Sequence, residues 1–353
     1  MVRLKDIALR AGVSLMTVSK ALRNAPDISP TTKARVKLLA ETMGYVPDSA
    51  AQNLRNRNSK LFGLIIPAIT DPFFARLISA IEERTRNLGC DLIFAHSMNQ
   101  ADREDASIRR LLSRRVDGLF ISPVYRMAPT VPIYEELRRR STPTVILGHN
   151  VPFCQNFANV EGDDLGGSFA ATSHLLELGH RRIAFFSGPL GSPWAQERLE
   201  GYRRALRTAE IELDDRLVFT AGSTVDEGEK AALQLIDESV EVTAVQAVND
   251  LVAIGAANLF LNQGIKIPHE LSVVGFGNIL ASEYFRVPLT TLRHPKYRLG
   301  EAAVDCMLQL LDRKTPDPRR LPAGLVIRES TARPGPMHPG KTSGQTAAPR
   351  ANP

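Results

Sequence analysis

The sequence predicts a small all-α helix-turn-helix head followed by a large α/β region whose two lobes each hold a doubly wound parallel sheet. Two observations predict this organisation. The first 57 residues hold ten Lys and Arg against four Asp and Glu, an excess of six that equals the net charge of the whole chain. From Lys60 to about Glu329, short apolar runs alternate with amphipathic helical segments, which is typical of buried parallel strands separated by helices.

The basic segment has the pattern of a helix-turn-helix. Its first helix carries apolar residues on one stripe: Leu4, Ile7, Ala8 and Ala11. Gly12 ends that helix, and Ser14 caps a second helix that runs to about Leu22. A third helix is predicted over residues 30–43. The second helix of this motif enters the major groove of DNA, so the segment is predicted to bind nucleic acid. The alternative is a three-helix bundle with a solvated basic surface.

The α/β region shows a regular alternation of elements. Strands are predicted over residues 62–66, 92–95, 118–121, 145–147, 183–186, 244–248 and 273–276. Helices are predicted over residues 73–88, 106–115, 167–178, 195–209, 227–238, 251–263 and 296–312. A region of about 270 residues is long for one open sheet, so we expect two lobes.

Short motifs along the chain resemble the lac/gal repressor family. In the head these are Leu4-Lys5-Asp6-Ile7-Ala8, Ala11-Gly12-Val13-Ser14 and Thr17-Val18-Ser19-Lys20-Ala21-Leu22. The α/β region continues the resemblance with Asn249-Asp250, Ser272-Val273-Val274-Gly275-Phe276 and Pro288-Leu289-Thr290-Thr291-Leu292. The resemblance implies the fold of periplasmic sugar-binding proteins, with a ligand between two lobes and crossovers near Glu161, Arg293 and Pro322.

The resemblance also implies a function and a division of the chain. We expect a sequence-specific transcriptional repressor whose affinity for operator DNA is controlled by a small-molecule effector, a sugar or related metabolite. The implied parts are a head over 1–47, a hinge helix or linker over 48–59, an effector-binding and dimerisation domain over 60–330, and a tail over 331–353 that we expect to be disordered. One head reads too few base pairs for tight binding, so a homodimer on a palindrome is expected, and dimer versus tetramer is left open.

The residues that the resemblance implies at the DNA lie in the head and the hinge. They are Leu4, Ser14, Leu15, Met16, Thr17, Ser19, Lys20, Asn24, Ala51, Leu54 and Arg55. Leu15, Met16 and Lys20 are expected at base edges, and Leu54 is expected as a wedge between base pairs in the minor groove. Lys20 stands where the family has Arg and lacks the bidentate fork for guanine. A partly packed Leu15 and an ordinary linker in place of the hinge helix are the alternatives.

Ligands of such sheets bind outside the carboxyl ends of the strands. The residues expected around the effector are Phe74, Pro123, His149, Asp163, Trp194, Arg198, Asn249, Asp250 and Asn278. Phe74 and Trp194 are expected to supply flat apolar faces, and Arg198, Asn249 and Asp250 hydrogen bonds. Phe73 is expected in the core.

One position departs from the family. After Val273-Val274-Gly275-Phe276 the family typically has an Asp that accepts hydrogen bonds from the effector, and this chain has Gly277. Three explanations stay open: the effector is not an ordinary sugar, another group compensates, or effector control is altered.

Other patterns exclude further functions. Residues 335–342 match the phosphate-binding-loop pattern but lack the flanking strand and helix, and no metal or cofactor site is expected. No catalytic constellation supports the alternative of a ligand-binding protein or enzyme with a fused DNA-binding head. Three cysteines argue against a disulfide framework. No signal peptide or long apolar run is present, so a cytoplasmic protein without membrane contact is expected.

Overall fold

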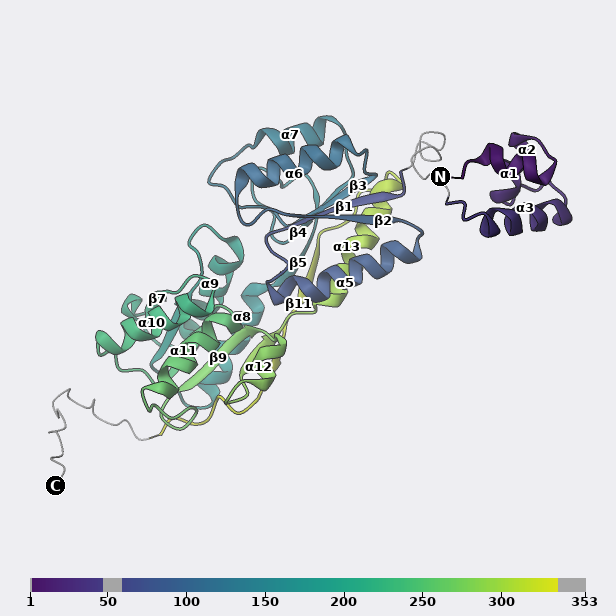
Figure 1. Cartoon of the computed structure of the whole chain (residues 1–353). Coiled ribbons are helices and arrows are strands. Elements are labelled where there is room, and N and C mark those ends of the chain that lie inside the picture. Colours follow the sequence, from purple (N-terminus) through teal and green to yellow (C-terminus); the bar gives the residue numbers. More distant parts are fainter. Residues whose placement is uncertain (1, 47–58, 336–353) are drawn as a thin grey trace, which may run out of the picture. The chain divides into compact units, whose positions relative to one another are not determined.

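The computed structural model describes residues 2–46 and 59–335 (Figure 1). Its internal contacts divide the chain into two units, Met1–Ser59 and Lys60–Pro353. The predicted fold class is confirmed: the first unit is helical, and the second contains two six-stranded sheets covered by helices.

The head consists of three helices around a small core. They are α1 (Leu4–Ala11), α2 (Leu15–Leu22) and α3 (Pro30–Thr42), as predicted within one residue. Gly12 ends α1 with a φ of +64°, the left-handed conformation expected of a glycine stop. Ile7, Val18 and Val36 are fully buried and hold the three helices together.

The N-terminal lobe of the second unit contains a parallel sheet of order β11-β5-β4-β3-β1-β2. Its strands are β1 (Leu61–Ile66), β2 (Asp91–His96), β3 (Gly118–Ile121), β4 (Thr144–Leu147), β5 (Ala158–Asp163) and β11 (Arg319–Pro322). Its helices are α5 (Pro72–Asn87), α6 (Ala101–Ser113), α7 (Pro132–Arg139) and α13 (Lys296–Leu311). In Figure 1, α6 and α7 cover one face of the sheet, and α5 and α13 cover the other.

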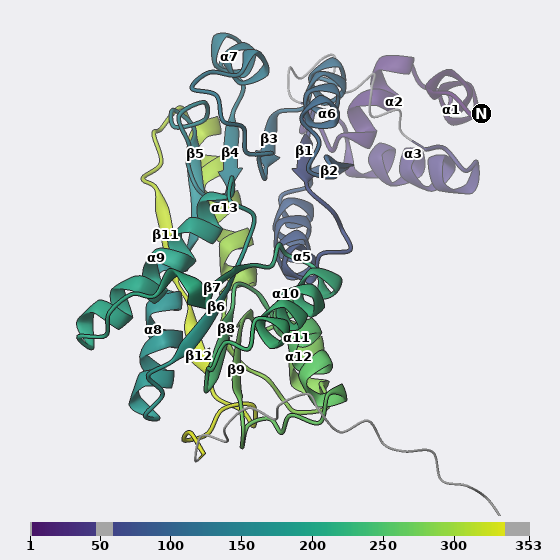
Figure 2. The same ribbon diagram turned by 90° about the vertical axis from the view of Figure 1, so that its left-hand side faces the viewer.

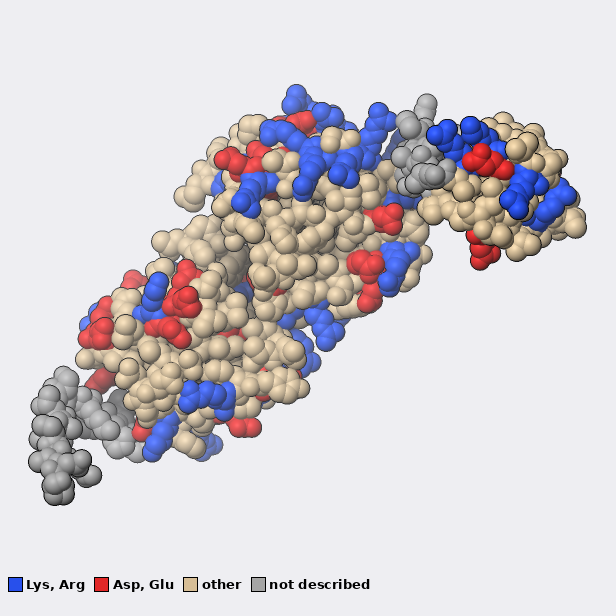
Figure 3. All heavy atoms as spheres, viewed as in Figure 1, with Lys and Arg blue, Asp and Glu red and all other residues tan. Residues whose placement is uncertain are grey.

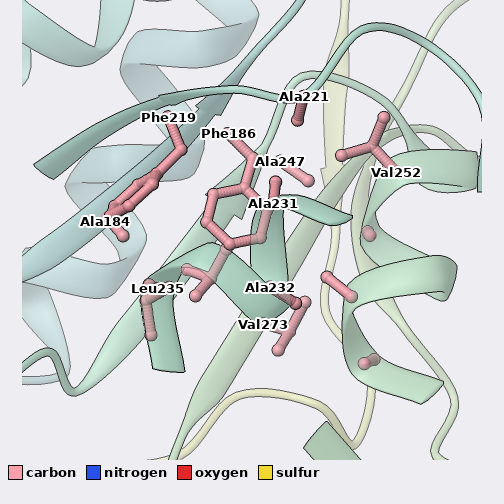
Figure 4. Close-up of a cluster of buried hydrophobic side chains, with 14 of the residues drawn as sticks. Ala184, Phe186, Phe219, Ala221, Ala231, Ala232, Leu235, Ala247, Val252 and Val273 are labelled. Carbon is pink, nitrogen blue, oxygen red and sulfur yellow. The ribbon is translucent and has the colours of Figure 1, made fainter. Parts of the chain in front are cut away.

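The C-terminal lobe has a similar sheet of order β12-β10-β9-β8-β6-β7, in which the edge strand β12 is antiparallel to β10 and the other strands are parallel. Its strands are β6 (Ile183–Ser187), β7 (Val218–Thr220), β8 (Ala244–Ala247), β9 (Ser272–Gly277), β10 (Thr290–Arg293) and β12 (Gly324–Val326). Its helices are α8 (Asp164–Glu177), α9 (Pro193–Thr208), the 3-10 helix η1 (Asp215–Leu217), α10 (Val225–Asp237), α11 (Asp250–Asn262) and α12 (Leu280–Tyr284). Figure 2 shows α8 and α9 on one side of the sheet and α10 and α11 on the other. Alanines, valines and three phenylalanines are prominent in the core on the α10–α11 side, where Figure 4 shows Phe186 and Phe219.

The chain passes between the lobes three times. The first crossover joins β5 to α8 after Asp163, the second joins β10 to α13 at His294 and Pro295, and the third is Ala323, between β11 and β12. The carboxyl ends of the strands of both sheets therefore meet the crossovers in one region.

Several elements were not predicted, and all are short or polar. They are β5, β7, β10, β11, β12, α7, η1 and α12. The sequence of β11, Arg-Arg-Leu-Pro, has no apolar alternation, because this strand lies at the sheet edge and is held by main-chain pairing with β5. Helix α7 has only eight residues and begins with Pro132.

The tail does not begin at residue 331, where we expected it, because the residues that follow are bonded to the C-terminal lobe. Thr331 Oγ1 lies 3.0 Å from His174 Nε2, and the Ala332 amide donates to Ser272 Oγ at 3.1 Å. His180 Nε2 lies 2.9 Å from the Ala332 carbonyl oxygen. These residues are bonded to α8, β9 and the turn after α8, so they belong to the C-terminal lobe. The phosphate-loop-like stretch lies outside the described residues except for Gly335.

Candidate DNA interface and ligand site

The N-terminal end of α2 presents two apolar side chains to solvent. Ser14 caps the helix, since its Oγ accepts a hydrogen bond from the Thr17 amide at 3.1 Å and lies 2.9 Å from the Thr17 hydroxyl. Leu15 and Met16 follow directly and are 53% and 54% exposed. Leu15 is thus not a core residue of the head, and the part of its surface that is covered fits the alternative of a partly packed side chain. These side chains are available to apolar groups such as thymine methyls.

The C-terminal end of α2 carries positive charge that is partly paired. Lys20 Nζ donates a hydrogen bond to Asp27, and this bond lowers the pKa of the Asp27 carboxyl. Asn24, with a φ of +56°, accepts a hydrogen bond from Lys37 Nζ at 2.6 Å. The main-chain oxygen of Ser19 accepts one from Arg23 Nε at 3.0 Å. Lys20 must release Asp27 before it can reach a base, and the pair is exposed, so this release costs little.

Of the other residues expected at the DNA, one packs against the core of the head and three lie outside the described residues. The side chain of Leu4 packs against the core of the head, so it stabilises the head and is not part of the exposed face of α2. Ala51, Leu54 and Arg55 lie outside the described residues.

Arg198, on α9, is the centre of a buried polar network between the lobes. Its Nε donates to Asp164 Oδ1 at 2.7 Å, and its Nη1 donates to the Val248 carbonyl at 2.6 Å. Its Nη2 lies 3.1 Å from His294 Nε2. The guanidinium carbon lies 4.8 Å from the ring centre of Trp194 and 3.8 Å from that of Phe276. Arg198 is thus fixed by protein groups on every side.

His149 reaches this network from the N-terminal lobe. It follows β4, and its ring nitrogens lie 3.1 Å from Glu197, 3.5 Å from Asp164 and 3.9 Å from Glu161. Burial opposes the charge of His149, but the bond to Glu197 and the nearby carboxylates raise its pKa. Burial likewise opposes the charge of Asp164, but Arg198 and the two histidines hold the pKa of Asp164 well below its usual range. The lobes are therefore joined by charged pairs.

Asp163 and the strand β11 complete the network. Asp163 Oδ1 accepts a hydrogen bond from the Gly166 amide at 3.0 Å and so caps α8. Arg320 lies 3.3 Å from Asp163, 3.7 Å from Glu161 and in hydrogen-bond contact with Glu197. Sequence reasoning missed the partners in this network: Glu161, Asp164, Glu197, His294 and Arg320. Glu161 was named only as the place of a crossover, and the proximity of all three crossovers is the one signal that could have found these residues.

The aromatic assignment on α5 is corrected. Phe74 is buried in the core of the N-terminal lobe, because it shares a helical stripe with Leu77 and Ile81 that faces the sheet. Phe73 packs against the same core, as expected, and also lies edge-on to His294, with ring centres 5.4 Å apart. Pro123, after β3, is buried.

Asn249 and Asp250 are bonded within the C-terminal lobe. Asn249 caps α11, since its Oδ1 accepts from the Val252 amide at 2.8 Å, and its Nδ2 donates to the Ser223 carbonyl at 2.9 Å. Asp250 accepts from the Thr291 hydroxyl at 2.5 Å and from the Ile279 amide at 2.8 Å. Burial raises the pKa of Asp250 despite these bonds.

The loop after β9 accommodates the Asp250 carboxylate. Gly277 has a φ of +138°, and a Cβ added there would lie 3.4 Å from Asp250 Oδ2. Asn278 follows with a φ of +49°, and its side-chain oxygen accepts a hydrogen bond from Arg328 at 2.7 Å. Lys296 Nζ donates to the Asn278 carbonyl at 3.1 Å. The carboxylate nearest to this turn therefore comes from Asp250 on α11.

Comparison with known proteins identifies the class of this architecture. Residues 3–48 match the model of bacterial regulatory proteins of the lacI family, and residues 172–331 match that of a periplasmic binding protein-like domain. The chain is 33% identical over 334 residues to the HTH-type transcriptional repressor CytR of Escherichia coli (strain K12), covering 93% of this chain and 96% of that protein. It is 31% identical over 324 residues to the HTH-type transcriptional repressor PurR of Vibrio atlanticus (strain LGP32), covering 90% and 95%.

Solved structures agree with this class. The lac repressor dimer bound to operator and the anti-inducer ONPF superimposes with a TM-score of 0.84 at 26% identity, covering 94% of this chain and 99% of that chain. The complex of the transcriptional regulator CelR with cellobiose gives a TM-score of 0.71 at 28% identity, covering 94% and 100%. A helix-turn-helix head joined to such a two-lobed domain defines a DNA-binding transcriptional repressor. The chain belongs to the lacI family of bacterial regulatory proteins, as its motifs indicated.

Membrane spans and metal sites are absent from the described residues. Within residues 2–46 and 59–335, no helix is long and apolar enough to cross a membrane. In the same part of the chain, no group of His, Cys, Asp and Glu is arranged to hold a metal ion.

Proposed function

We propose that this repressor binds a palindromic operator as a homodimer and reads it with the N-terminal end of α2. The observation that carries the proposal is the pair Leu15 and Met16, both more than half exposed at a capped helix end inside a basic head. Ser14, Thr17 and Ser19 are suited to phosphates, and Leu15, Met16 and Lys20 to base edges. Two heads related by two-fold symmetry would read two half-sites.

We further propose that a small-molecule effector binds between the lobes and controls operator affinity. Trp194, Phe73 and the groups around Arg198 combine aromatic faces with hydrogen-bonding groups, as small-molecule sites do. The proposal is supported by solved relatives described as complexes with cellobiose and with ribose. The contacts of His149 and Arg320 with Glu197 join the two lobes, so an effector that exchanges these contacts for its own would link binding to the separation of the lobes.

The DNA half of the proposal is tested by selection. The purified protein is mixed with sheared genomic DNA of its source organism at moderate salt, and the retained DNA is sequenced. Enrichment of a short palindrome upstream of a few genes supports the proposal, and the products of those genes nominate effectors. Retention without a common sequence contradicts it.

The effector half is tested by titration with the nominated metabolites. We expect one of them to bind and to change operator affinity, while mass analysis shows the metabolite unaltered. Conversion into a product would instead favour an enzyme with a fused DNA-binding head, and binding without any change in operator affinity would contradict the link between the two sites.

A further inference from the structure

The positive charges of the two-lobed unit are unevenly distributed, although its total charge is balanced. Residues 58–353 hold 34 basic and 34 acidic side chains. The segments that lead into the strands of the N-terminal-lobe sheet nevertheless hold ten Lys and Arg against four Asp. These segments are residues 60, 86–91, 113–118, 138–144 and 312–319, and we call the surface that they form the strand-start edge. Its excess of six positive charges equals that of the head.

The topology brings these segments together. β1, β3 and β4 are parallel neighbours, with Phe62 opposite Gly118 and Leu119 opposite Thr144. Neighbouring parallel strands in this register start at one edge, so the C-terminal ends of α6 and α7, which precede β3 and β4, lie at that edge. Figure 3 shows Lys and Arg side chains gathered over α6 and α7. The strand-start edge is opposite the carboxyl ends of the strands, where the effector site lies.

The arginines of the strand-start edge are exposed and largely without acidic partners. Arg138 and Arg140 pair with Glu135 and Glu136, but their side chains remain 56% and 59% exposed. In the part of the chain that the structure describes, no carboxylate lies within ion-pair distance of Arg114, Arg115 or Arg139. A helix dipole favours a cation only in the last helical turn. Arg115 lies beyond α6 with a φ of +57°, so the dipole does not account for its position.

The strand-start edge is also where the chain arrives from the head. β1 begins there at Leu61, and the fourteen residues 47–60 join it to Val46, the last described residue of the head. A chain of that length spans at most about 50 Å. DNA held by the head is therefore kept near this edge at high effective concentration.

We propose that the strand-start edge binds the phosphate backbone of duplex DNA that flanks the operator. Planar guanidinium groups match phosphate geometry, and an exposed basic surface gains counterion release on binding DNA. This inference rests on the proposed function, since it needs DNA delivered by the head. It adds a contact that reads no sequence and strengthens binding to long DNA.

The test uses the full-length chain with Arg114→Gln, Arg115→Gln and Arg139→Gln combined. The control combines Arg204→Gln, Arg207→Gln and Arg216→Gln, which removes three exposed arginines from the C-terminal lobe. Binding is measured over a range of salt concentrations to the selected palindrome in a duplex of about 20 base pairs and in one of about 60 base pairs. Circular dichroism shows whether both variants are folded.

We expect the edge variant to bind the long duplex roughly tenfold more weakly than wild type at low salt, with a salt dependence shallower by about 0.9 for each phosphate that the variant no longer neutralises. Its binding to the short duplex, and the control's binding to both, should stay within about twofold of wild type. Unchanged binding to the long duplex, or equal weakening on both duplexes, would overturn the inference. If no palindrome is found, mixed-sequence duplexes of the same two lengths decide it, and the missing palindrome counts against the proposed function alone.

Discussion

The N-terminal end of α2 and the network between the lobes are built in opposite ways. Leu15 and Met16 lie at a capped helix end, and more than half of the surface of each is exposed. Arg198 and Asp164 are buried and hydrogen-bonded to each other. His294 lies 3.1 Å from Arg198 and 3.2 Å from Asp164, and His149 lies 3.5 Å from Asp164. A surface that reads a large partner can keep its side chains open, because the partner supplies the missing contacts. A site that also joins two lobes must satisfy its own charges when no ligand is bound.

The largest expected effect is the loss of Arg198. Arg198→Ala leaves Asp164 buried with a reduced set of partners, so the free energy of unfolding should fall by about 3–5 kcal/mol. Arg204→Ala, at an exposed ion pair on the same helix, should cost less than about 1 kcal/mol. Urea denaturation of both variants measures the difference. Equal losses of unfolding free energy in the two variants would contradict the claim that the buried network stabilises the fold more than an exposed ion pair.

The N-terminal end of α2 should show the reverse behaviour: a substitution there should weaken operator binding without lowering the stability of the fold. Leu15→Ala removes apolar contact with the operator, so operator binding should weaken by roughly 1–2 kcal/mol while the unfolding transition is unchanged. Leu9 is 88% exposed on α1, and Leu9→Ala serves as the matched control. Fluorescence anisotropy with labelled operator measures both. If Leu9→Ala lowered operator affinity as much as Leu15→Ala, the prediction that α2 reads the operator would be contradicted.

The pH dependence of stability tests the contacts of His149 with the carboxylates between the lobes. The pKa of His149 is raised from its ordinary value of 6.5 in the folded chain. Its pairing therefore stabilises the fold fully below the unfolded-state pKa, and this contribution is lost as the pH rises through the folded-state pKa. The difference in unfolding free energy between wild type and His149→Gln should be largest near about pH 6 and shrink toward about pH 9. His269→Gln, at an exposed histidine, is the control, and a difference for His149→Gln that stays constant with pH would contradict the assignment.

The smallest effect concerns the pair that holds Lys20. Asp27→Asn removes the charge that competes with DNA for Lys20, so operator affinity should rise by roughly two- to fivefold at low salt. Raising the salt concentration should reduce this gain, because exposed charges are screened. An unchanged or weaker affinity, measured by the same anisotropy titration, would mean that Lys20 does not act at the DNA.

The two regions also differ in how far the sequence predicts them. The helices of the head follow from local signals, the stop at Gly12 and the cap at Ser14, and the structure has them where they were expected. The network between the lobes depends on residues from five separate segments that meet only through the crossovers, so Glu197, His294 and Arg320 carried no local signal. Phe74 was misplaced because neighbours on a helix differ by about 100° in direction, and the pattern did not show that the stripe of Phe74 faces the sheet.

The central claim, that the exposed end of α2 reads the operator, is tested most directly by repeating the genomic selection with Leu15→Ala. We expect the variant to retain the same palindrome with a relaxed base preference at one position, which appears symmetrically in both half-sites. An unchanged preference at every position would contradict the claim, because Leu15 would then lie beside the DNA without reading it.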